Sequence, residues 1–422
     1  MFFGKAFQRS LNLAVILILT LTANVLMAGA QGAPIPATDG EAIAQGFNGP
    51  QGILIDPDGN VWVIDSGLGG DADIPWITPE GETVTGKMGD TAQVARIAPD
   101  GSVIKIASLP SVAAGQDIVG GARLARLNGT LYATVGQGIG DPATEMPPNM
   151  GVVARIGPDG MVTEVADLWD FERENNPDPA MYDAHPYGLE AGPDGMLYVA
   201  DAGANDLLKV NPSTGEVSLV AVFEPIPGVF PRPDRGGEMV TDPVPTDVVF
   251  DAQGNMLVSF LSGAPFVPGS AKVVKVTPDG TVTDYATGYT MLTDLDWGPD
   301  GKLYGVQFGI FGEQGPTPNS GMVVRIEQGA GPQPVIEGLS FPIAIDFNDK
   351  GDAYVAINAV GPPGSGAVLA FRNLAPAPPK TLPVTGGEQP DTAVPWWSLV
   401  VVAALATALA FGGLKAWRRS AS

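Results

Sequence analysis

Residues 185–223 read HPYGLEAGPDGMLYVADAGANDLLKVNPSTGEVSLVAVF, and this stretch decides the fold. It contains two tight turns, at 193–195 and 212–215, because Gly supplies the positive φ that a short hairpin needs. The apolar alternation around these turns predicts four short strands, at 188–191, 196–201, 206–211 and 216–223. Because such a four-stranded antiparallel meander cannot bury its faces alone, we expect stacked copies of it along the chain.

The first hairpin of this unit recurs six times. Its copies begin at residues 50, 120, 188, 245, 292 and 342, and each contains a turn with Gly. The outer hairpin recurs at 94–107, 152–166, 207–222, 273–286 and 323–337. The sixth copy stops after its third strand, at 367–372, and segment 38–47 has the pattern of the missing fourth strand.

The repeats predict an all-β fold, a six-bladed β-propeller of four-stranded antiparallel blades that spans 31–373. An N-terminal outer strand in the last blade would close the ring and remove an exposed sheet edge. A solenoid of four-stranded sheets is the alternative, but it would need capping repeats and would leave segment 38–47 without a partner.

The composition excludes several classes of site. The 422 residues include no Cys and one His, which excludes disulfides and thiolate sites and argues against a multi-His zinc site or a His-dependent triad. The formal net charge of −24 argues against binding of nucleic acid. No nucleophile-elbow, zinc-protease, phosphate-loop or dinucleotide motif is present.

Both ends of the chain carry targeting patterns. Residues 1–30 combine Lys5 and Arg9, an apolar run and Ala28-Gly29-Ala30, which predicts a secretory signal peptide; an uncleaved anchor is the alternative. A Pro-rich linker at 374–393 contains LPVTG, followed by an apolar transmembrane helix at 394–417 and a basic cytoplasmic tail at 418–422. This order resembles the LPxTG signal of sortase substrates.

The sorting signal sets the expected location and partners. The resemblance implies that a sortase cuts between Thr385 and Gly386 and joins the protein to the cell envelope. The alternative is a permanent membrane anchor with its basic end inside. Either reading predicts a secreted protein held at the cell wall or at the outer face of the cytoplasmic membrane.

Loop lengths indicate which face of the propeller is functional. The turns within each hairpin are short, whereas the connections between second and third strands and between blades are long, for example 66–91, 167–184 and 224–244. Because long loops on a rigid scaffold usually carry binding sites, we expect the long-loop face to bind an unidentified small molecule or protein. Among its side chains we predict Trp76 and Trp169 as ligand contacts; packing of the loops onto the propeller is the alternative.

Alignment of the blades predicts two rings of side chains at the mouth of the central channel. The first contains Gly52, Ala122, Gly188, Asp247, Asp294 and Ala344, and the second contains Asp65, Val135, Asp201, Phe260, Gln307 and Ile357. Oxygen-rich positions of this kind suit Ca²⁺, so Asp201, Asp247 and Asp294 are candidate metal ligands and candidate catalytic residues. In the alternative, these carboxylates are solvated or cap backbone amides. His185 and Tyr187 lie at the same mouth, with Asp65 and Gln307, as candidate ligand contacts, and His185 is also a candidate base.

Three segments resemble the ScyD/ScyE family of secreted propeller proteins. They are HPYGL at 185–189, YVADAGAN at 198–205 and SGAPFVPG at 262–269. More loosely, the blades are similar to NHL-repeat and gluconolactonase-like propellers. The resemblance implies fold and location, and the gluconolactonase-like relatives imply a channel metal, for which Asp201, Asp247 and Asp294 are the counterparts.

Two functions from different classes follow from these patterns. The first is a non-enzymatic, surface-anchored propeller that binds a ligand or partner on its long-loop face. The second is a metal-dependent hydrolase of the lactonase type, with Ca²⁺ in the channel and His185 assisting. The family name alone suggests a third, lyase or isomerase chemistry on a pigment precursor.

Overall fold

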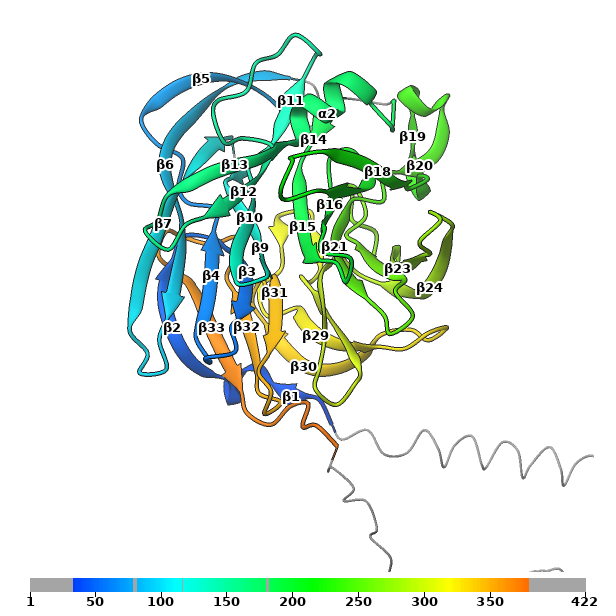
Figure 1. Cartoon of the computed structure of the whole chain (residues 1–422). Helices are drawn as coiled ribbons and strands as arrows, with labels where there is room; N and C mark the ends of the chain where they lie inside the picture. Colours follow the sequence, from blue (N-terminus) through cyan, green and yellow to red (C-terminus); the bar gives the residue numbers. More distant parts are fainter. Residues whose placement is uncertain (1–32, 79–81, 116, 180–181, 379–422) are drawn as a thin grey trace, which may run out of the picture. The chain divides into compact units, whose positions relative to one another are not determined.

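The structure is a computed structural model that describes residues 33–78, 82–115, 117–179 and 182–378. These residues are nearly all β and form six large sheets, numbered here in chain order, each with four antiparallel strands in a meander (Figure 1). The first strand of each sheet contacts the first strands of both neighbouring sheets, so the sheets close into a ring. This is the arrangement of a β-propeller.

Sheets 1 to 3 each contain two hairpins in succession. Sheet 1 has β3 (Pro50–Ile55), β4 (Val61–Asp65), β6 (Thr83–Ile97) and β7 (Val103–Ala114); sheet 2 has β9 (Gly121–Leu127), β10 (Thr130–Val135), β12 (Val152–Ile156) and β13 (Val162–Asp167); sheet 3 has β15 (Pro186–Ala191), β16 (Leu197–Asp201), β17 (Asp206–Val210) and β18 (Val217–Val222).

Sheets 4 and 5 repeat this order, and sheet 6 takes its fourth strand from the other end of the chain. Sheet 4 has β21 (Pro245–Phe250), β22 (Met256–Phe260), β23 (Ala271–Val276) and β24 (Val282–Tyr289); sheet 5 has β25 (Leu292–Trp297), β26 (Leu303–Gln307), β29 (Gly321–Ile326) and β30 (Gln333–Leu339); sheet 6 has β31 (Ala344–Phe347), β32 (Ala353–Ile357), β33 (Gly366–Phe371) and β2 (Glu41–Phe47).

The N-terminal segment joins two sheets. β2 pairs antiparallel with β33, which confirms the predicted position of this strand. Just before it, β1 (Ile35–Pro36) adds a parallel pairing to the edge of β30 in sheet 5, and η1 (Ala37–Asp39) connects the two short pairings. The first described residues therefore cover the outer edges of sheets 5 and 6.

The hairpin turns are stabilised by their own aspartates. In sheet 1, Oδ1 of Asp56 accepts hydrogen bonds from the backbone N–H groups of Asp58 and Asn60, while Gly59 adopts a φ of +81°. Asp251 makes the same contacts in sheet 4, to Gln253 and Asn255. In both sheets the carboxylate therefore stabilises the turn itself.

The long connections fold into structure of their own. Within sheet 1, β5 (Ala72–Ile77) pairs with an extension of β6, and β8 (Asp117–Val119) pairs with β7. Helix α2 (Leu168–Asn175) begins where the Asp167 side chain accepts a hydrogen bond from Asp170 N–H. The other additions are β11 (Gly138–Gly140), β14 (Tyr182–Ala184), β19 (Ile226–Arg232), η2 (Pro233–Arg235), β20 (Glu238–Thr241), β27 (Phe311–Gly312) and β28 (Gly315–Pro316).

The hydrophobic core lies between neighbouring sheets. Ile64 and Leu109 of sheet 1 pack against Leu131 and Val152 of sheet 2, and all four side chains are buried. Comparable clusters join the other neighbouring pairs, so each sheet is buried on both faces.

The targeting predictions lie outside the described residues. Signal peptide 1–30, the LPVTG motif with Thr385 and Gly386, and the apolar span 394–417 all fall in the segments that the structure does not describe. Within the described part of the chain, no helix is long and apolar enough to cross a membrane.

Candidate functional site

One residue from each sheet faces the centre of the ring at the same level. Strand register identifies these six residues. In five sheets the residue pairs with the second-last residue of the neighbouring second strand, and in sheet 2 it lies opposite Thr134, the second-last residue of β10. We call this set the inner level; it contains Gly52, Arg123, Gly188, Asp247, Asp294 and Ala344. The sequence alignment had placed Ala122 there, and this was wrong by one residue.

The shift in sheet 2 comes from the position at which its first strand begins. Sheets 1, 3, 4 and 5 have a one-residue bulge at the same place, but in sheet 2 it is Gly121, not Gly120, that takes the position of Pro50 in sheet 1. Ala133 pairs with Leu124 and Val135 pairs with Gly121, so two residues of β9 lie opposite Thr134 alone. Thr134 Oγ1 accepts a hydrogen bond from Arg123 N–H, which fixes this register. The sequence therefore delivers a guanidinium, rather than a methyl group, to the inner level.

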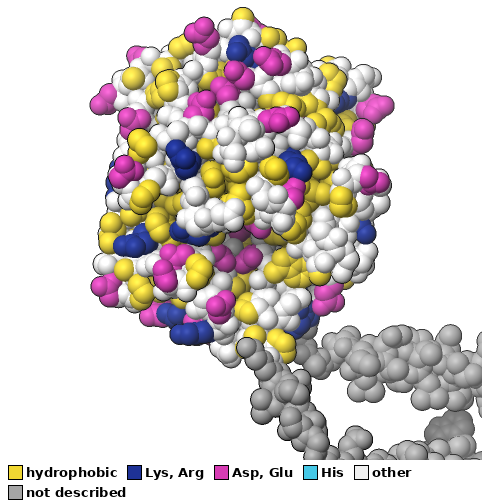
Figure 2. All heavy atoms as spheres, viewed as in Figure 1, with side chains coloured by type: hydrophobic (Ala, Val, Ile, Leu, Met, Phe, Trp, Pro, Cys, Tyr) yellow, Lys and Arg dark blue, Asp and Glu magenta, His cyan; other side chains and the backbone are white. Residues whose placement is uncertain are grey.

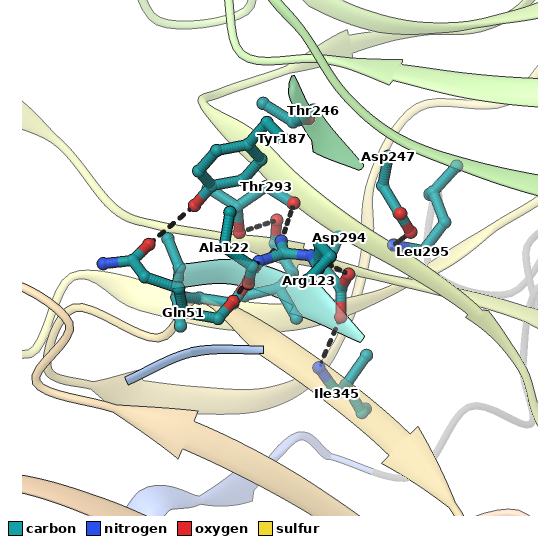
Figure 3. A network of polar contacts seen from close by, with 12 residues as sticks. Gln51, Ala122, Arg123, Tyr187, Thr246, Asp247, Thr293, Asp294, Leu295 and Ile345 are labelled. Carbon is teal, nitrogen blue, oxygen red and sulfur yellow. Dashed lines mark hydrogen bonds and ion pairs between the residues drawn. The ribbon is translucent and has the colours of Figure 1, made fainter. Parts of the chain in front are cut away.

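The Arg123 side chain spans the ring. Its Nη2 donates to the backbone carbonyl of Thr293 at 2.5 Å and to that of Ile343 at 3.2 Å, and its Nη1 donates to the carbonyl of Gln51 (Figure 3). These carbonyls belong to sheets 5, 6 and 1, and sheet 5 lies opposite sheet 2 in the ring. The guanidinium thus fills the channel at this level.

Two side chains complete the surroundings of the guanidinium. Its Nε lies 3.2 Å from Oδ1 of Asp294, an ion pair in which both side chains are buried. The ring of Tyr187 lies 4.7 Å from the Arg123 Cζ, and its hydroxyl donates to Gln51 Oε1 at 2.8 Å (Figure 3). Burial raises the pKa of Tyr187, so its hydroxyl stays protonated and remains a donor.

The inner-level carboxylates also join neighbouring sheets. Asp247 accepts a hydrogen bond from Leu295 N–H at 3.0 Å, and Asp294 accepts one from Ile345 N–H at 2.6 Å. Two residues further along β31, Asp346 accepts from Ile55 N–H at 2.6 Å. Each bond crosses from one sheet to the next, so these carboxylates bind the ring together.

Further acids lie one step deeper on the same strand faces. Glu190 and Asp296 join Asp346 there, two residues beyond the inner level, because alternate residues of a strand share a face. Burial raises the pKa of Glu190 to about 8 and that of Asp346 to about 7, and it raises that of Asp296 well above its ordinary value. The alternation of β15, β25 and β31 was the signal in the sequence that could have identified them.

The second predicted ring caps loops. The Asp65 carboxylate accepts from the N–H groups of Asn48 and Gln93, and Gln307 Oε1 accepts from Thr290 N–H at 2.6 Å. Both side chains are buried. Main-chain amides thus occupy oxygens of both side chains, and contact of Asp65 and Gln307 with a ligand stays a prediction.

Asp201 also caps a loop, at a different place from Asp247 and Asp294. Its Oδ1 accepts from the N–H groups of His185, Gly203 and Ala204 at 2.7 to 3.1 Å. Its charged neighbours are other acids of sheet 3 and its loops, whereas Asp247 and Asp294 neighbour each other and Arg123. The three predicted metal ligands do not form one site.

The residues therefore do not fit a channel metal of the predicted kind. In the described ranges, no three carboxylate or imidazole groups are gathered so that they would hold a metal ion. At the inner level, the positive charge beside Asp294 comes from Arg123. The prediction of Ca²⁺ held by Asp201, Asp247 and Asp294 is corrected accordingly.

The predicted aromatic contacts are packed inside the loops. Trp76, on β5, is 5% exposed and packs with Val112 and Ile139. Trp169, on α2, is 2% exposed, and its Nε1 donates to the Thr144 carbonyl at 2.9 Å. β5 and α2 turn these rings inward, which agrees with the alternative that the loops pack onto the propeller; contact of either ring with a ligand stays a prediction.

His185 keeps its predicted place beside Tyr187. Their ring centroids are 5.8 Å apart in an edge-to-face contact, and both rings are half-buried. Burial lowers the pKa of His185 to about 4, so the imidazole is neutral at neutral pH. Its ring contact is with Tyr187, and Tyr187 in turn contacts the Arg123 guanidinium.

A groove of about 870 Å³ lies on the opposite face, between the tight turns of sheets 6 and 1. Its acidic lining includes Glu41, Asp56, Asp100 and Asp349, and Arg372 crosses it in an ion pair with Glu41 at 2.7 Å. Read along the chain, these are ordinary turn residues, so no signal in the sequence indicates the groove.

Comparisons with solved structures find propellers at low similarity. Regucalcin from Agrobacterium tumefaciens str. C58 is 12% identical, with a TM-score of 0.46 over 82% of this chain and 99% of that chain. A PQQ-bound aldose sugar dehydrogenase from Streptomyces coelicolor is 14% identical, with a TM-score of 0.45 over 79% and 96%. Virginiamycin B lyase from Staphylococcus aureus is 13% identical, with a TM-score of 0.40 over 77% and 84%.

No family model and no curated protein matches the chain. With TM-scores below 0.5, the structural likenesses carry no argument about activity. The function has to be argued from the geometry of this chain.

Proposed function

We propose that this chain is a secreted, surface-anchored, six-bladed β-propeller of the ScyD/ScyE kind that binds a ligand or partner, without catalysis, through its long-loop face. The six sheets with their closed ring of first strands support the blade number. The sortase signal supports the anchoring, and the resemblance of segments 185–189, 198–205 and 262–269 supports the family.

The position of Arg123 is the observation that carries the non-enzymatic reading. A substrate or metal in the channel would need the space at the inner level, which the guanidinium fills by bonding to carbonyls of three sheets. Its charge also compensates Asp294, one of the two acids that would have to hold a divalent cation there. Catalysis at Asp247 and Asp294 would require this buried side chain to leave.

Apolar exposure favours the long-loop face as the binding surface. Of the thirteen exposed large hydrophobic side chains among the described residues, seven lie in the long connections. They are Leu68, Val229, Phe230, Met239, Ile310, Phe311 and Val360. Phe230 is 63% exposed, and Phe311 lies 4.9 Å from the Phe266 ring. Aromatic anchors of this kind are enriched at binding surfaces.

Acidic side chains are spread over the face drawn in Figure 2, which suits solubility.

Envelope binding of matched variants tests the proposed surface. We expect Phe230→Ser with Phe311→Ser to reduce retention of the purified protein on isolated envelopes of the source cell by at least about tenfold. Leu219→Ser with Met161→Ser, which change exposed apolar residues outside the long connections, should leave retention unchanged. Equal retention of both variants would reject the long-loop face.

Hydrolysis of simple γ- and δ-lactones tests the alternative function. A metal-dependent lactonase, with Ca²⁺ in the channel, would turn these substrates over in Ca²⁺ and lose activity with a chelator. We expect no turnover in either condition. Chelator-sensitive hydrolysis that is abolished in Asp247→Asn would favour the enzyme over the binding protein.

The anchoring proposal has its own readout. Sortase processing predicts that protein released from the wall ends at Thr385, as measured by mass spectrometry of its C-terminal peptide. A C-terminus beyond residue 394 in the mature protein would instead favour the permanent membrane anchor.

A further inference from the structure

A second group of buried acids lies under the long-loop face, away from the inner level. It consists of Glu172 on α2, Asp178 in the loop after α2, Asp183 on β14, and Asp201 and Asp206 at the ends of β16 and β17. All five are at least nine-tenths buried. We call this group the sheet 3 carboxyl cluster.

The hairpin between β16 and β17 places two members of the cluster face to face. Asp201 and Asp206 are directly paired across the antiparallel strands, on either side of the loop 202–205. Side chains of such a pair project to the same side of the sheet with their Cβ atoms about 5 Å apart. Asp206 also lies close enough to Glu172 and Asp178 for their negative charges to repel its own.

The cluster contains carboxylate oxygens with no donor. Asp206 is 0% exposed, and neither of its oxygens has a hydrogen-bond partner in the described part of the chain. The same holds for Oδ2 of Asp201 and for Oε2 of Glu172, which are 0% and 1% exposed. Four buried, unpartnered oxygens on neighbouring acids are costly unless a cation or protons join them.

The surrounding protein supplies little positive charge. Among the described residues, Arg235 alone forms an ion pair with the cluster, at Asp178, where its Nη2 lies 2.5 Å from Oδ2. Asp178 also accepts from Asn205 Nδ2, and Asp183 accepts from Gln137 Nε2 at 2.7 Å. These donors lie at the periphery of the cluster. In the described part of the chain Asp201, Asp206 and Glu172 have no ion pair, although Asp201 Oδ1 accepts from three backbone N–H groups.

We propose that Asp201 and Asp206 bind a calcium ion at this hairpin, with Glu172 contributing further negative charge. Only oxygen ligands are at hand, which suits a hard cation and not a soft metal. Calcium accepts irregular arrangements in which two carboxylates are supplemented by backbone carbonyl and water oxygens, so a preformed group of three acids is not required. The ion would fasten the β16–β17 hairpin to α2.

Calcium titration of the full chain tests this site. After treatment with EGTA, calorimetry at pH 7.5 should detect one Ca²⁺ per chain, and 1 mM Ca²⁺ should raise Tm by at least about 4 °C. Magnesium should give a smaller shift, because it demands near-octahedral geometry. Absence of both the heat and the Tm shift in the native sequence would overturn the proposal, and would indicate that protons or buried water satisfy these oxygens.

Asp206→Asn is the decisive variant. It breaks no hydrogen bond of the described structure, so we expect it to fold, with a Ca²⁺-free Tm equal to or above that of the native sequence, and to lose the calcium response. Asp247→Asn, at the inner level, should keep that response. Retention of calcium binding in Asp206→Asn, or its loss in Asp247→Asn alone, would place the ion elsewhere and reject the site. Neither result depends on envelope binding or lactone hydrolysis.

Discussion

Arg123 and Asp294 form a buried ion pair between opposite sheets of the ring, with 3.2 Å between Nε and Oδ1 and less than a tenth of either side chain exposed. The pair joins sheet 2 to sheet 5, which are not neighbours in the ring. It is the one ion pair among the described residues that joins opposite sheets. Its removal therefore tests how much this central contact contributes to the stability of the ring.

Arg123→Met should lower the free energy of unfolding by about 3 kcal/mol, because it leaves Asp294 and three carbonyls without their donor in a buried site. Urea denaturation followed by circular dichroism measures this change. Arg155→Met is the matched control, because Arg155 lies exposed on β12, the third strand of sheet 2, and it should change stability by less than about 0.5 kcal/mol. If Arg123→Met lowered the free energy of unfolding as little as Arg155→Met does, the structural role of the guanidinium would be contradicted.

Stability should fall as pH rises from about 5 to 8.5. Burial raises the folded-state pKa of Glu190 to about 8 and that of Asp346 to about 7, so between their ordinary values and these pKa values the folded chain holds protons that the unfolded chain releases. Stability is therefore lost as pH rises through this range. Tm measured across the range should decrease.

Glu190→Gln should flatten that pH dependence, because it removes the group with the higher of the two values. Asp159→Asn, in an exposed turn, is the control and should leave the slope unchanged. A native Tm that rises with pH over the same range would show that these carboxyl groups are ionised in the folded chain.

Asp65→Ala should destabilise the chain by about 2 kcal/mol, because it leaves the buried N–H groups of Asn48 and Gln93 without an acceptor. Asp65→Asn keeps one acceptor oxygen and should cost less. The midpoint of urea unfolding gives both values, with Asp58→Ala, an exposed turn residue of the same sheet, as the control. If Asp65→Ala proved as stable as Asp58→Ala, the capping role would be refuted.

Trp169→Phe should reduce stability by about 1 kcal/mol through the lost hydrogen bond to the Thr144 carbonyl, and should leave envelope binding intact. Phe230→Ser should leave stability nearly unchanged and reduce envelope binding, because that ring is 63% exposed. Thermal unfolding and envelope retention, measured on the same preparations, separate the two roles. Loss of envelope binding in Trp169→Phe at unchanged stability would support that residue as a ligand contact.

The local signals in the sequence were sufficient for the sheets. Gly59 with Asp58, and Gly195 with Asp194, mark turns whose geometry depends on neighbouring residues only, and the apolar alternation beside them defines the strands. The pairing of β2 with β33 followed from the count of strands, since the last repeat lacked one. These features are independent of side-chain packing.

The site was harder to predict because it depends on register and packing. The start of β9 decided whether Ala122 or Arg123 reached the inner level, because this strand begins one residue later than the repeat pattern predicts, while the bulge beside it is common to sheets 1 to 5. Trp76 and Trp169 lie in connections that were treated as open loops, but β5 and α2 fold there and bury the two rings. Asp65 and Asp201 were correctly placed at strand ends, but their oxygens are taken up by main-chain amides.

The pairing of β2 with β33 has a consequence for biosynthesis. Glu41 and Arg372, which form an ion pair at the end of that ladder, are 331 positions apart in the chain. The ring cannot close until almost the whole body has been synthesised, and until then β2 has no partner. Slow, long-range closure of this kind leaves an unpaired edge open to other chains, so we expect the nascent protein to need a chaperone more than the finished one does.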